Sequence, residues 1–152
     1  MFDKLMDLLS AAPTEKQPED DRACFAALLV HAARIDEHYA PEEQQMIDAI
    51  LAERYPELAV NEVADLRSEG ERLEHSATDT VSLTRALKKS VPHEDRVAVI
   101  EALWRVVLSD NSRGDDESAL LRLSVSLLGV SDQDSGLARQ RVKERLAARP
   151  NR

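Results

Sequence analysis

Two pairs of acidic residues stand at matching places in the chain, and their types and spacing are those of candidate metal ligands. Six residues separate Asp36 from Glu43, and six separate Asp110 from Glu117. Each Asp ends an apolar helical stretch and each Glu falls in the first turn of the next, so a short loop can bring the two carboxylates together. Carboxylate oxygens, with loop carbonyls and water, suit a hard divalent cation, with Ca²⁺ or Mg²⁺ favoured.

Other side chains near these loops extend the same chemistry. Asp115 and Asp116 add oxygens to the second loop, and Glu42 adds one carboxylate to the first. Both loops are too short for the twelve-residue EF-hand pattern, so the sequence predicts a different kind of site. His38 lies inside the first loop, but a single histidine is weak evidence for a transition metal.

The same carboxylates have a purely structural alternative as helix caps. An Asp next to a helix start can accept backbone N–H groups, and a Glu in the first turn is favoured by the positive end of the helix dipole. In this alternative the protein is an interaction or scaffold domain whose acidic face recruits a basic partner. Asp110, however, follows the end of a helix, where a negative charge is unfavourable unless something compensates it. Both alternatives stay open.

The elements that must position these residues are helices. Leu, Ala, Val, Glu and Arg dominate the chain while aromatic residues make up 3%, which favours helices over strands. Apolar residues recur at helical spacing, most clearly from Val97 to Leu108, a stretch expected to be central. The 152 residues therefore predict an all-α fold, a single compact domain of seven or eight helices. An open helical repeat is the second choice.

An internal repeat relates the two acidic loops. Residues 25–51 align with residues 99–125, so that Leu29 pairs with Leu103 and Ile47 with Leu121. The same alignment pairs both Asp residues and both Glu residues of the two loops. The sequence therefore predicts two pseudo-repeated helix-loop-helix units.

These features make the chain resemble the tellurite-resistance protein B (TerB-like) family, whose helical domain carries two copies of an "aDG…E" pattern. The resemblance covers about residues 22–146 and includes "LLVHAARID", "WRVVLSD" and "LLGVS". The family's Gly after the Asp is Glu37 in the first copy and Asn111 in the second. Because Asn tolerates left-handed backbone geometry better than Glu, the second loop is the stronger candidate of the two.

The resemblance implies a cytoplasmic, stress-associated module with acidic, metal-binding clusters, linked to a tellurite or stress response. The sequence shows no nucleophile elbow, P-loop or dinucleotide-binding glycine pattern, so we expect no enzyme activity. We expect a protein partner, whose identity the residues do not reveal. A cation at the loops would change the surface offered to that partner.

Charge and composition exclude other classes. The net charge of −9 opposes binding to nucleic acid, although residues 137–152 are basic. No stretch reaches membrane-spanning length, and one cysteine, Cys24, permits no internal disulfide, which fits the cytoplasm. At the N-terminus, the spacing of Phe2, Leu5, Met6 and Leu9 predicts a helix over residues 2–11, docked on the core or mobile.

Overall fold

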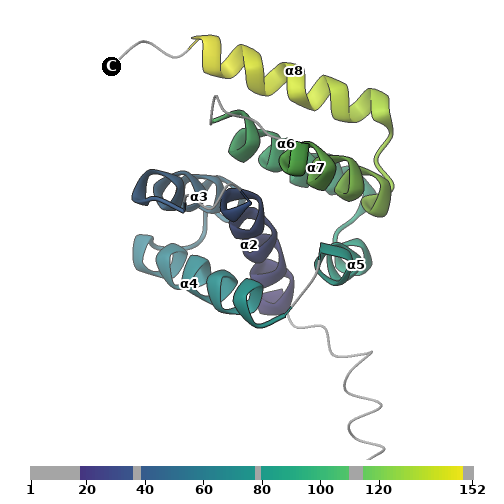
Figure 1. Ribbon diagram of the computed structural model, residues 1–152. Helices are drawn as coiled ribbons and strands as arrows, with labels where there is room; N and C mark the ends of the chain where they lie inside the picture. The colour runs from purple at the N-terminus through teal and green to yellow at the C-terminus, as the bar shows by residue number, and fades with distance from the viewer. Residues whose placement is uncertain (1–17, 36–38, 78–79, 110–114, 149–152) are drawn as a thin grey trace, which may run out of the picture.

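The predicted all-α bundle is confirmed. The computed structural model describes residues 18–35, 39–77, 80–109 and 115–148, and every regular element within these ranges is an α-helix. The helix expected over residues 2–11 lies outside them. None of the described helices combines the length and apolar character needed to cross a bilayer. The seven described helices (Figure 1) are α2 (Pro18–Arg34), α3 (Pro41–Arg54), α4 (Val60–Ala77), α5 (Thr80–Ser90), α6 (His93–Leu108), α7 (Asp115–Leu128) and α8 (Asp132–Ala148).

Helix α2 shares the centre of the bundle with α6. It packs against α3, α4, α5 and α6, whereas α6 packs against α2, α3, α7 and α8. Residues 25–30 of α2 are all at least 97% buried, although the apolar spacing indicated one buried face. Short side chains explain the difference, because Ala26 and Ala27 let neighbouring helices approach α2 from several sides. The expectation that α6 alone would be central was therefore incomplete.

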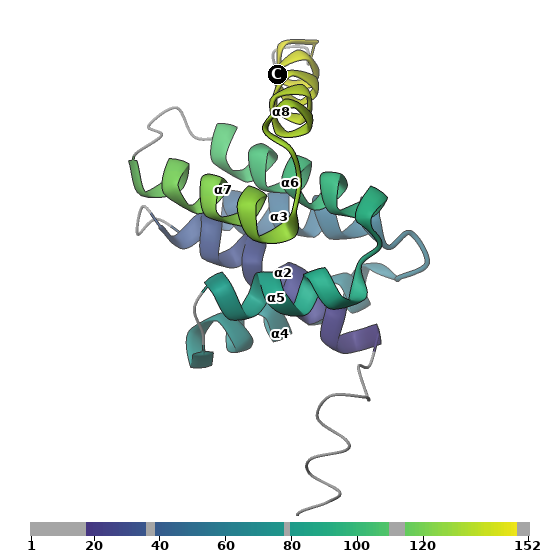
Figure 2. The ribbon, with the colours of Figure 1, turned by 90° about the vertical axis from the view of Figure 1, so that its right-hand side faces the viewer.

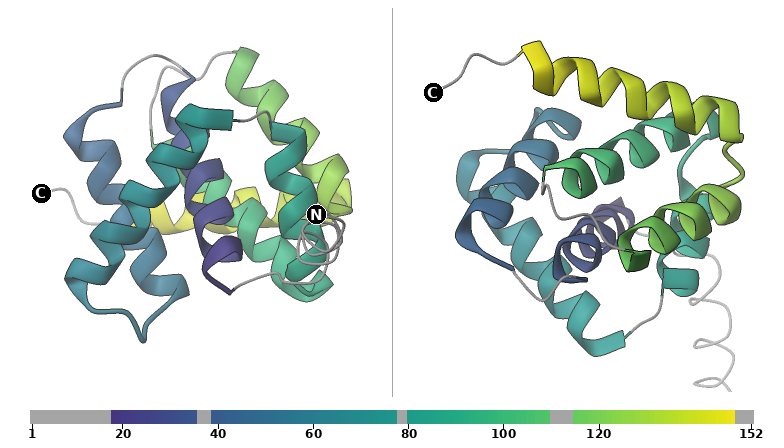
Figure 3. Two further views of the ribbon diagram at one scale, coloured as in Figure 1. Left: turned by 90° about the horizontal axis from the view of Figure 1, so that it is seen from below. Right: turned by 45° about the horizontal axis from the view of Figure 1, so that its top comes forward.

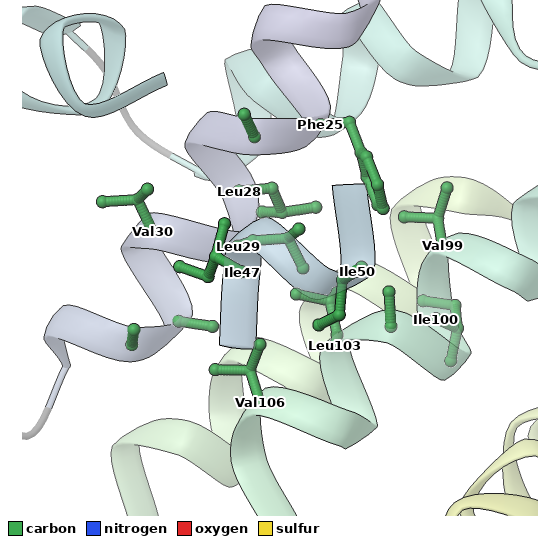
Figure 4. Packing of buried hydrophobic residues seen from close by; sticks show 14 of the residues in the cluster. Phe25, Leu28, Leu29, Val30, Ile47, Ile50, Val99, Ile100, Leu103 and Val106 are labelled. Atoms are coloured by element: carbon green, nitrogen blue, oxygen red, sulfur yellow. The ribbon is translucent and has the colours of Figure 1, made fainter. Parts of the chain in front are cut away.

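The core lies where α2, α3 and α6 meet (Figure 4). Leu28 and Leu29 of α2 lie near Ile47 and Ile50 of α3 and Leu103 of α6 in one cluster of buried side chains. The apolar positions that the sequence alignment pairs all belong to this core or pack against it: Leu29 and Leu103, Ala33 and Val107, Met46 and Leu120, Ile47 and Leu121, Leu51 and Val125.

Several helix boundaries follow from local sequence. Pro41 is the first residue of α3, as expected, since the first turn needs no N–H from it. Gly129 follows α7 with φ of 72°, a left-handed conformation that glycine adopts without strain. The Ser131 Oγ accepts the backbone N–H of Asp134 at 3.0 Å and so caps α8. Thr78, expected to cap α5, lies outside the described residues.

Helix α8 lies across α6 at one end of the bundle, which Figure 3 shows in its right-hand view. Ala138 and Val142 on its inner face are buried. Arg141 and Arg145 both bind Glu101 of α6, at 3.0 and 3.1 Å. Two arginines of the basic C-terminal stretch thus pair with an acidic residue of the same domain.

The described helix ends that flank the two acidic loops lie on the same side of the molecule. Figure 2 shows the last turns of α2 and α6 and the first turns of α3 and α7 on one side of the bundle. The view from below in Figure 3 also places the end of α2 and the starts of α3 and α7 along one edge. The described helix ends next to both candidate loops therefore belong to a single face of the fold.

Candidate functional site

The structure describes the four predicted metal ligands to different extents. Asp36 and Asp110 lie outside the described residues. Glu117 belongs to the first turn of α7, but its side chain also lies outside the described part. Among these four, Glu43, in the first turn of α3, is the ligand whose side-chain surroundings the structure describes.

Glu43 caps its own helix. Its Oε1 accepts the backbone N–H of Ala40 at 2.7 Å, while its own N–H donates to the Ala40 carbonyl at 3.0 Å. Helix α4 begins in a similar way, since Glu62 Oε1 accepts the backbone N–H of Ala59 at 2.8 Å. No Asp-x6-Glu pattern precedes Glu62, so capping alone is enough to place a Glu at this position.

Capping does not by itself exclude a cation. An ionised carboxylate offers about four acceptor sites, and one backbone hydrogen bond uses one of them. Across the ranges that the structure describes, however, no three His, Cys, Asp or Glu side chains come together as a metal centre requires. A cation in the first loop would therefore need ligands from residues 36–38 in addition to Glu43.

A polar network next to the first loop was not predicted. Tyr39, which directly follows residues 36–38, donates its hydroxyl to Glu71 Oε2 of α4 at 2.6 Å. The same oxygen accepts Arg67 Nη1 at 2.8 Å, and Arg67 Nε donates to Asp48 Oδ1 of α3 at 2.7 Å. These contacts join the end of the first loop to both α3 and α4.

The network continues onto α2. The Arg34 guanidinium lies over the Tyr39 ring, 5.1 Å from its centre, and pairs with Glu74 Oε1 at 3.4 Å. The second oxygen of Glu74 lies 3.2 Å from His31 Nδ1. Three helices are thus connected through Tyr39 and its neighbours, and we call Tyr39, Asp48, Arg67, Glu71, Arg34 and Glu74 the Tyr39 network.

The surroundings of Tyr39 and Arg67 within the network shift the pKa values of both groups. Burial raises the pKa of the Tyr39 phenol far above its ordinary value, and the hydrogen bond and charge of Glu71 act in the same direction. Burial of Arg67 opposes its charge, but hydrogen bonds to Asp48 and Glu71 outweigh this and raise its pKa. At neutral pH the phenol is therefore a hydrogen-bond donor and Arg67 a cation.

Among the described residues, the second unit differs from the first around this network, and the residue opposite Tyr39, Arg113, lies outside them. The repeat alignment places Arg105 opposite His31, Leu108 opposite Arg34 and Arg122 opposite Asp48. Arg105 instead binds Glu53 of α3 at 2.8 Å, which links the second unit to the first. The described surroundings of the two units thus differ, and Tyr39, which follows the first loop, contacts α4.

One signal for the network was present in the sequence. Arg67 and Glu71 are four residues apart on one helix, a spacing at which opposite charges meet. The other hydrogen-bonded and ion-paired partners are 19 to 43 positions apart, as in Arg67 with Asp48 and His31 with Glu74, and their pairing depends on how the helices pack.

A groove lies beside the start of α3. It has a volume of about 350 Å³ and runs between α3 and α8. Met46 and Ala49 of α3 and Val142 of α8 line it with apolar atoms, while Glu42 and Arg145 add opposite charges. Glu42 is the neighbour of Glu43 in the chain, so the groove adjoins the first acidic loop.

Comparison with known proteins gives one match. A family model described as tellurite resistance protein TerB matches residues 22–140. The matched range begins in α2 and ends in α8, so it contains the Tyr39 network and both acidic loops. No curated protein and no solved structure gives a significant match to this chain.

Proposed function

Because the chain belongs to the TerB family of tellurite resistance proteins over residues 22–140, we propose that it is a non-catalytic helical module that responds to a divalent cation. In this proposal the cation binds the acidic loops, at Asp110 and Glu117 first and at Asp36 and Glu43 second. Its binding alters a surface that a protein partner contacts. A cytoplasmic location and a role in a stress or tellurite response are part of the same proposal.

The donor set supports a hard cation. The four acidic side chains offer only oxygen ligands, which Ca²⁺ and Mg²⁺ prefer over the nitrogen and sulfur ligands of Zn²⁺. Glu43 already holds the first turn of α3 in place through Ala40. A preformed turn lowers the cost of ordering this ligand when a cation binds.

The Tyr39 network is the observation that carries the proposed response. Tyr39 lies between Asp36 and Glu43 in the sequence, and its hydroxyl and ring contact Glu71 and Arg34. A cation bound by both Asp36 and Glu43, which flank Tyr39 in the sequence, would favour one position of the Tyr39 side chain. This change would be transmitted to α4 through Glu71, and to α3 through Arg67 and Asp48. In this proposal a protein partner contacts the adjoining groove between α3 and α8, and its binding depends on this change.

Helix capping favours a second function, a protein-interaction or scaffold domain that binds no cation. The carboxylate of Glu43 makes the same kind of backbone contact as that of Glu62, which follows no Asp-x6-Glu loop. In this case the loop carboxylates serve only as caps and as an acidic surface. The two functions differ in whether divalent ions stabilise the folded state.

Thermal unfolding of chelator-stripped protein, with and without Ca²⁺ or Mg²⁺, separates the two. A cation at about a hundred times its dissociation constant adds about 2.7 kcal/mol to the free energy of unfolding. For a chain of this size the midpoint should rise by about 5–10 °C. The rise should be lost in a variant with Asp110→Asn and Glu117→Gln, and reduced in one with Asp36→Asn and Glu43→Gln.

Glu62→Gln is the matched control, because it alters the cap of α4 without touching either loop. Its midpoint should rise with the cation as in the parent protein. The proposed cation site is wrong if no ion raises the midpoint of the parent protein. It is also wrong if the midpoints of the loop variants rise with the cation as much as that of the control. The interaction domain with capping carboxylates is then the better description.

A further inference from the structure

A second groove, separate from the one between α3 and α8, opens where α7 and α8 both pack against α6. Its volume is about 320 Å³. Trp104 of α6 and Leu121 and Val125 of α7 give it an apolar lining. Leu121 and Val125 belong to the core, whereas Trp104 is half-buried, so part of the indole ring faces the groove.

The indole ring of Trp104 is held in one orientation. Its Nε1 donates to the Oγ of Ser135 in α8 at 3.2 Å, and Ser135 is itself buried. The space over the neighbouring Gly136 is open, since a Cβ atom there would meet nothing within 4 Å. An aromatic surface that is already fixed and open lowers the cost of ordering when a ligand binds.

Two arginines from different helices line the same groove. Arg122 of α7 is exposed, and the guanidinium of Arg139 of α8 lies 5.4 Å from the centre of the Trp104 ring. Neither arginine forms an ion pair with any residue in the described part of the chain. Asp132 also lines the groove, but it is the first residue of α8, where the positive end of the helix dipole compensates its charge.

The two flanks of α8 differ in how their cations are compensated. On the flank away from this groove, Arg141 and Arg145 both bind Glu101 of α6. On the flank of the groove, Lys143 follows Arg139 by four residues and adds a further positive charge on the same side of the helix. Among the described residues, the groove therefore combines an apolar surface with an excess of positive charge.

We propose that this groove binds a short acidic segment of a protein partner, in which an apolar side chain lies next to Asp or Glu. The apolar side chain packs on Trp104, and the carboxylates accept hydrogen bonds from Arg122 and Arg139. A guanidinium group matches the two oxygens of a carboxylate, so each arginine can bind one acidic side chain. The groove lies near the lower end of the range for ligand pockets, about 300–1,000 Å³, and so admits a few side chains.

The charge of the whole chain favours a short segment over a long polyanion. The net charge of −9 opposes nucleic acid and anionic membranes, which place many phosphates along the protein surface. A short peptide responds mainly to charges within the screening length, about 8 Å at physiological salt. The inference uses no residue of either acidic loop or of the groove between α3 and α8, so it does not depend on the cation proposal.

Fluorescence of Trp104, the one tryptophan of the chain, tests the proposal on the full protein. The end-blocked peptide Glu-Glu-Leu-Phe-Glu-Glu should shift its emission to shorter wavelength, because the covered ring loses contact with water. Arg122→Gln combined with Arg139→Gln should weaken binding by about tenfold or more. Arg141→Gln combined with Arg145→Gln is the matched control, since it removes the same charge from the other flank. The control should bind within about threefold of the parent.

A second pair of variants tests the position of the peptide. Gly136→Leu fills the open space of the groove and should abolish the emission shift. Gln133→Leu, at an exposed position of α8 outside the lining, should preserve it.

Three results would overturn the proposal. The first is no emission shift at peptide concentrations up to about 1 mM, or equal binding of a peptide with Gln in place of each Glu. The second is displacement of the peptide by a DNA oligonucleotide or anionic vesicles at lower concentration, which assigns the arginines to phosphate groups. The third is an emission shift that grows with protein concentration without peptide, which assigns the groove to a second copy of the chain.

Discussion

The hydroxyl of Tyr39 donates to the carboxylate of Glu71 at 2.6 Å, across 32 positions of sequence. This hydrogen bond joins the end of the first acidic loop to α4, a helix that no local pattern connects to it. Because Glu71 Oε2 also accepts from Arg67, the position of Tyr39 is tied to a charge pair that spans α3 and α4. In the function proposed above, Tyr39 is therefore the residue that would transmit a change in the loop to α4.

Removing the Tyr39 hydroxyl should destabilise the fold. Tyr39→Phe keeps the ring under Arg34 but deletes the donor to a charged acceptor, so we expect a loss of about 1–2 kcal/mol in the free energy of unfolding. Urea denaturation measures this loss. In a Glu71→Gln background, which weakens the acceptor, the same substitution should cost less. Equal costs in both backgrounds would show that the charge of Glu71 adds nothing to this hydrogen bond.

Both tyrosine phenols should ionise at a higher pH in the folded protein than in the unfolded chain. Burial raises the pKa of Tyr39 and of Tyr55, and for Tyr39 the charge of Glu71 adds to the effect. The folded state then binds the phenolic protons more tightly, so their contribution to stability is complete below about pH 10 and declines above it. Phenolate absorbance at 295 nm should therefore rise at higher pH in native protein than in urea.

The variants Tyr39→Phe and Tyr55→Phe assign the two steps of this titration. Tyr39→Phe should remove the later step, because Tyr39 carries the larger shift, and it should flatten the fall in stability above pH 10. A native titration that coincides with that of the unfolded chain contradicts the buried phenol.

Gly70 allows α2 and α4 to approach closely, and alanine should not fit in its place. A Cβ atom at Gly70 would lie 2.6 Å from the Cβ of Ala26 and 2.8 Å from its backbone carbonyl carbon. Gly70→Ala should therefore cost about 1–3 kcal/mol, despite the better helix propensity of alanine. Urea denaturation checks the sign as well as the size.

Gly136 in α8 is the matched control for Gly70. A Cβ atom there meets nothing within 4 Å, so Gly136→Ala should stabilise the protein by about 0.5–1 kcal/mol. We therefore expect Gly70→Ala to lower the free energy of unfolding and Gly136→Ala to raise it. A stabilising Gly70→Ala would contradict the close approach of α2 to α4.

Apolar burial, more than ion pairs, should hold α8 on α6. Val142 is 1% exposed, and Val142→Ala should cost about 2 kcal/mol through lost burial and the cavity it leaves. Glu101→Gln weakens the pairs with Arg141 and Arg145, which are about half exposed, and should cost at most about 1 kcal/mol.

Salt separates these two contributions to α8 docking. The cost of Glu101→Gln should shrink as salt is added, whereas that of Val142→Ala should not. Fluorescence of Trp104, which donates to Ser135 of α8 at 3.2 Å, reports the docking of α8 during unfolding. A larger cost for Glu101→Gln than for Val142→Ala would reverse the assignment.

Much of the fold could be predicted because its signals are local. Pro41 at the start of α3, Gly129 after α7 and Ser131 as the cap of α8 act through residues no more than four positions away. The apolar positions paired by the repeat lie in the core or pack against it for the same reason, since helical spacing defines a buried face. The role of the acidic loops stays a prediction.

The sequence by itself determined the helical class and the family, because each depends on patterns within a few turns or on matched residues in two halves. Only the tertiary structure decided that α2 shares the centre with α6 and that Tyr39 meets Glu71. Small side chains such as Ala26 and Gly70 set how closely helices approach, and that approach decides which distant polar groups come within hydrogen-bonding distance. No spacing rule along one helix contains this information, since it arises from the packing of several helices at once.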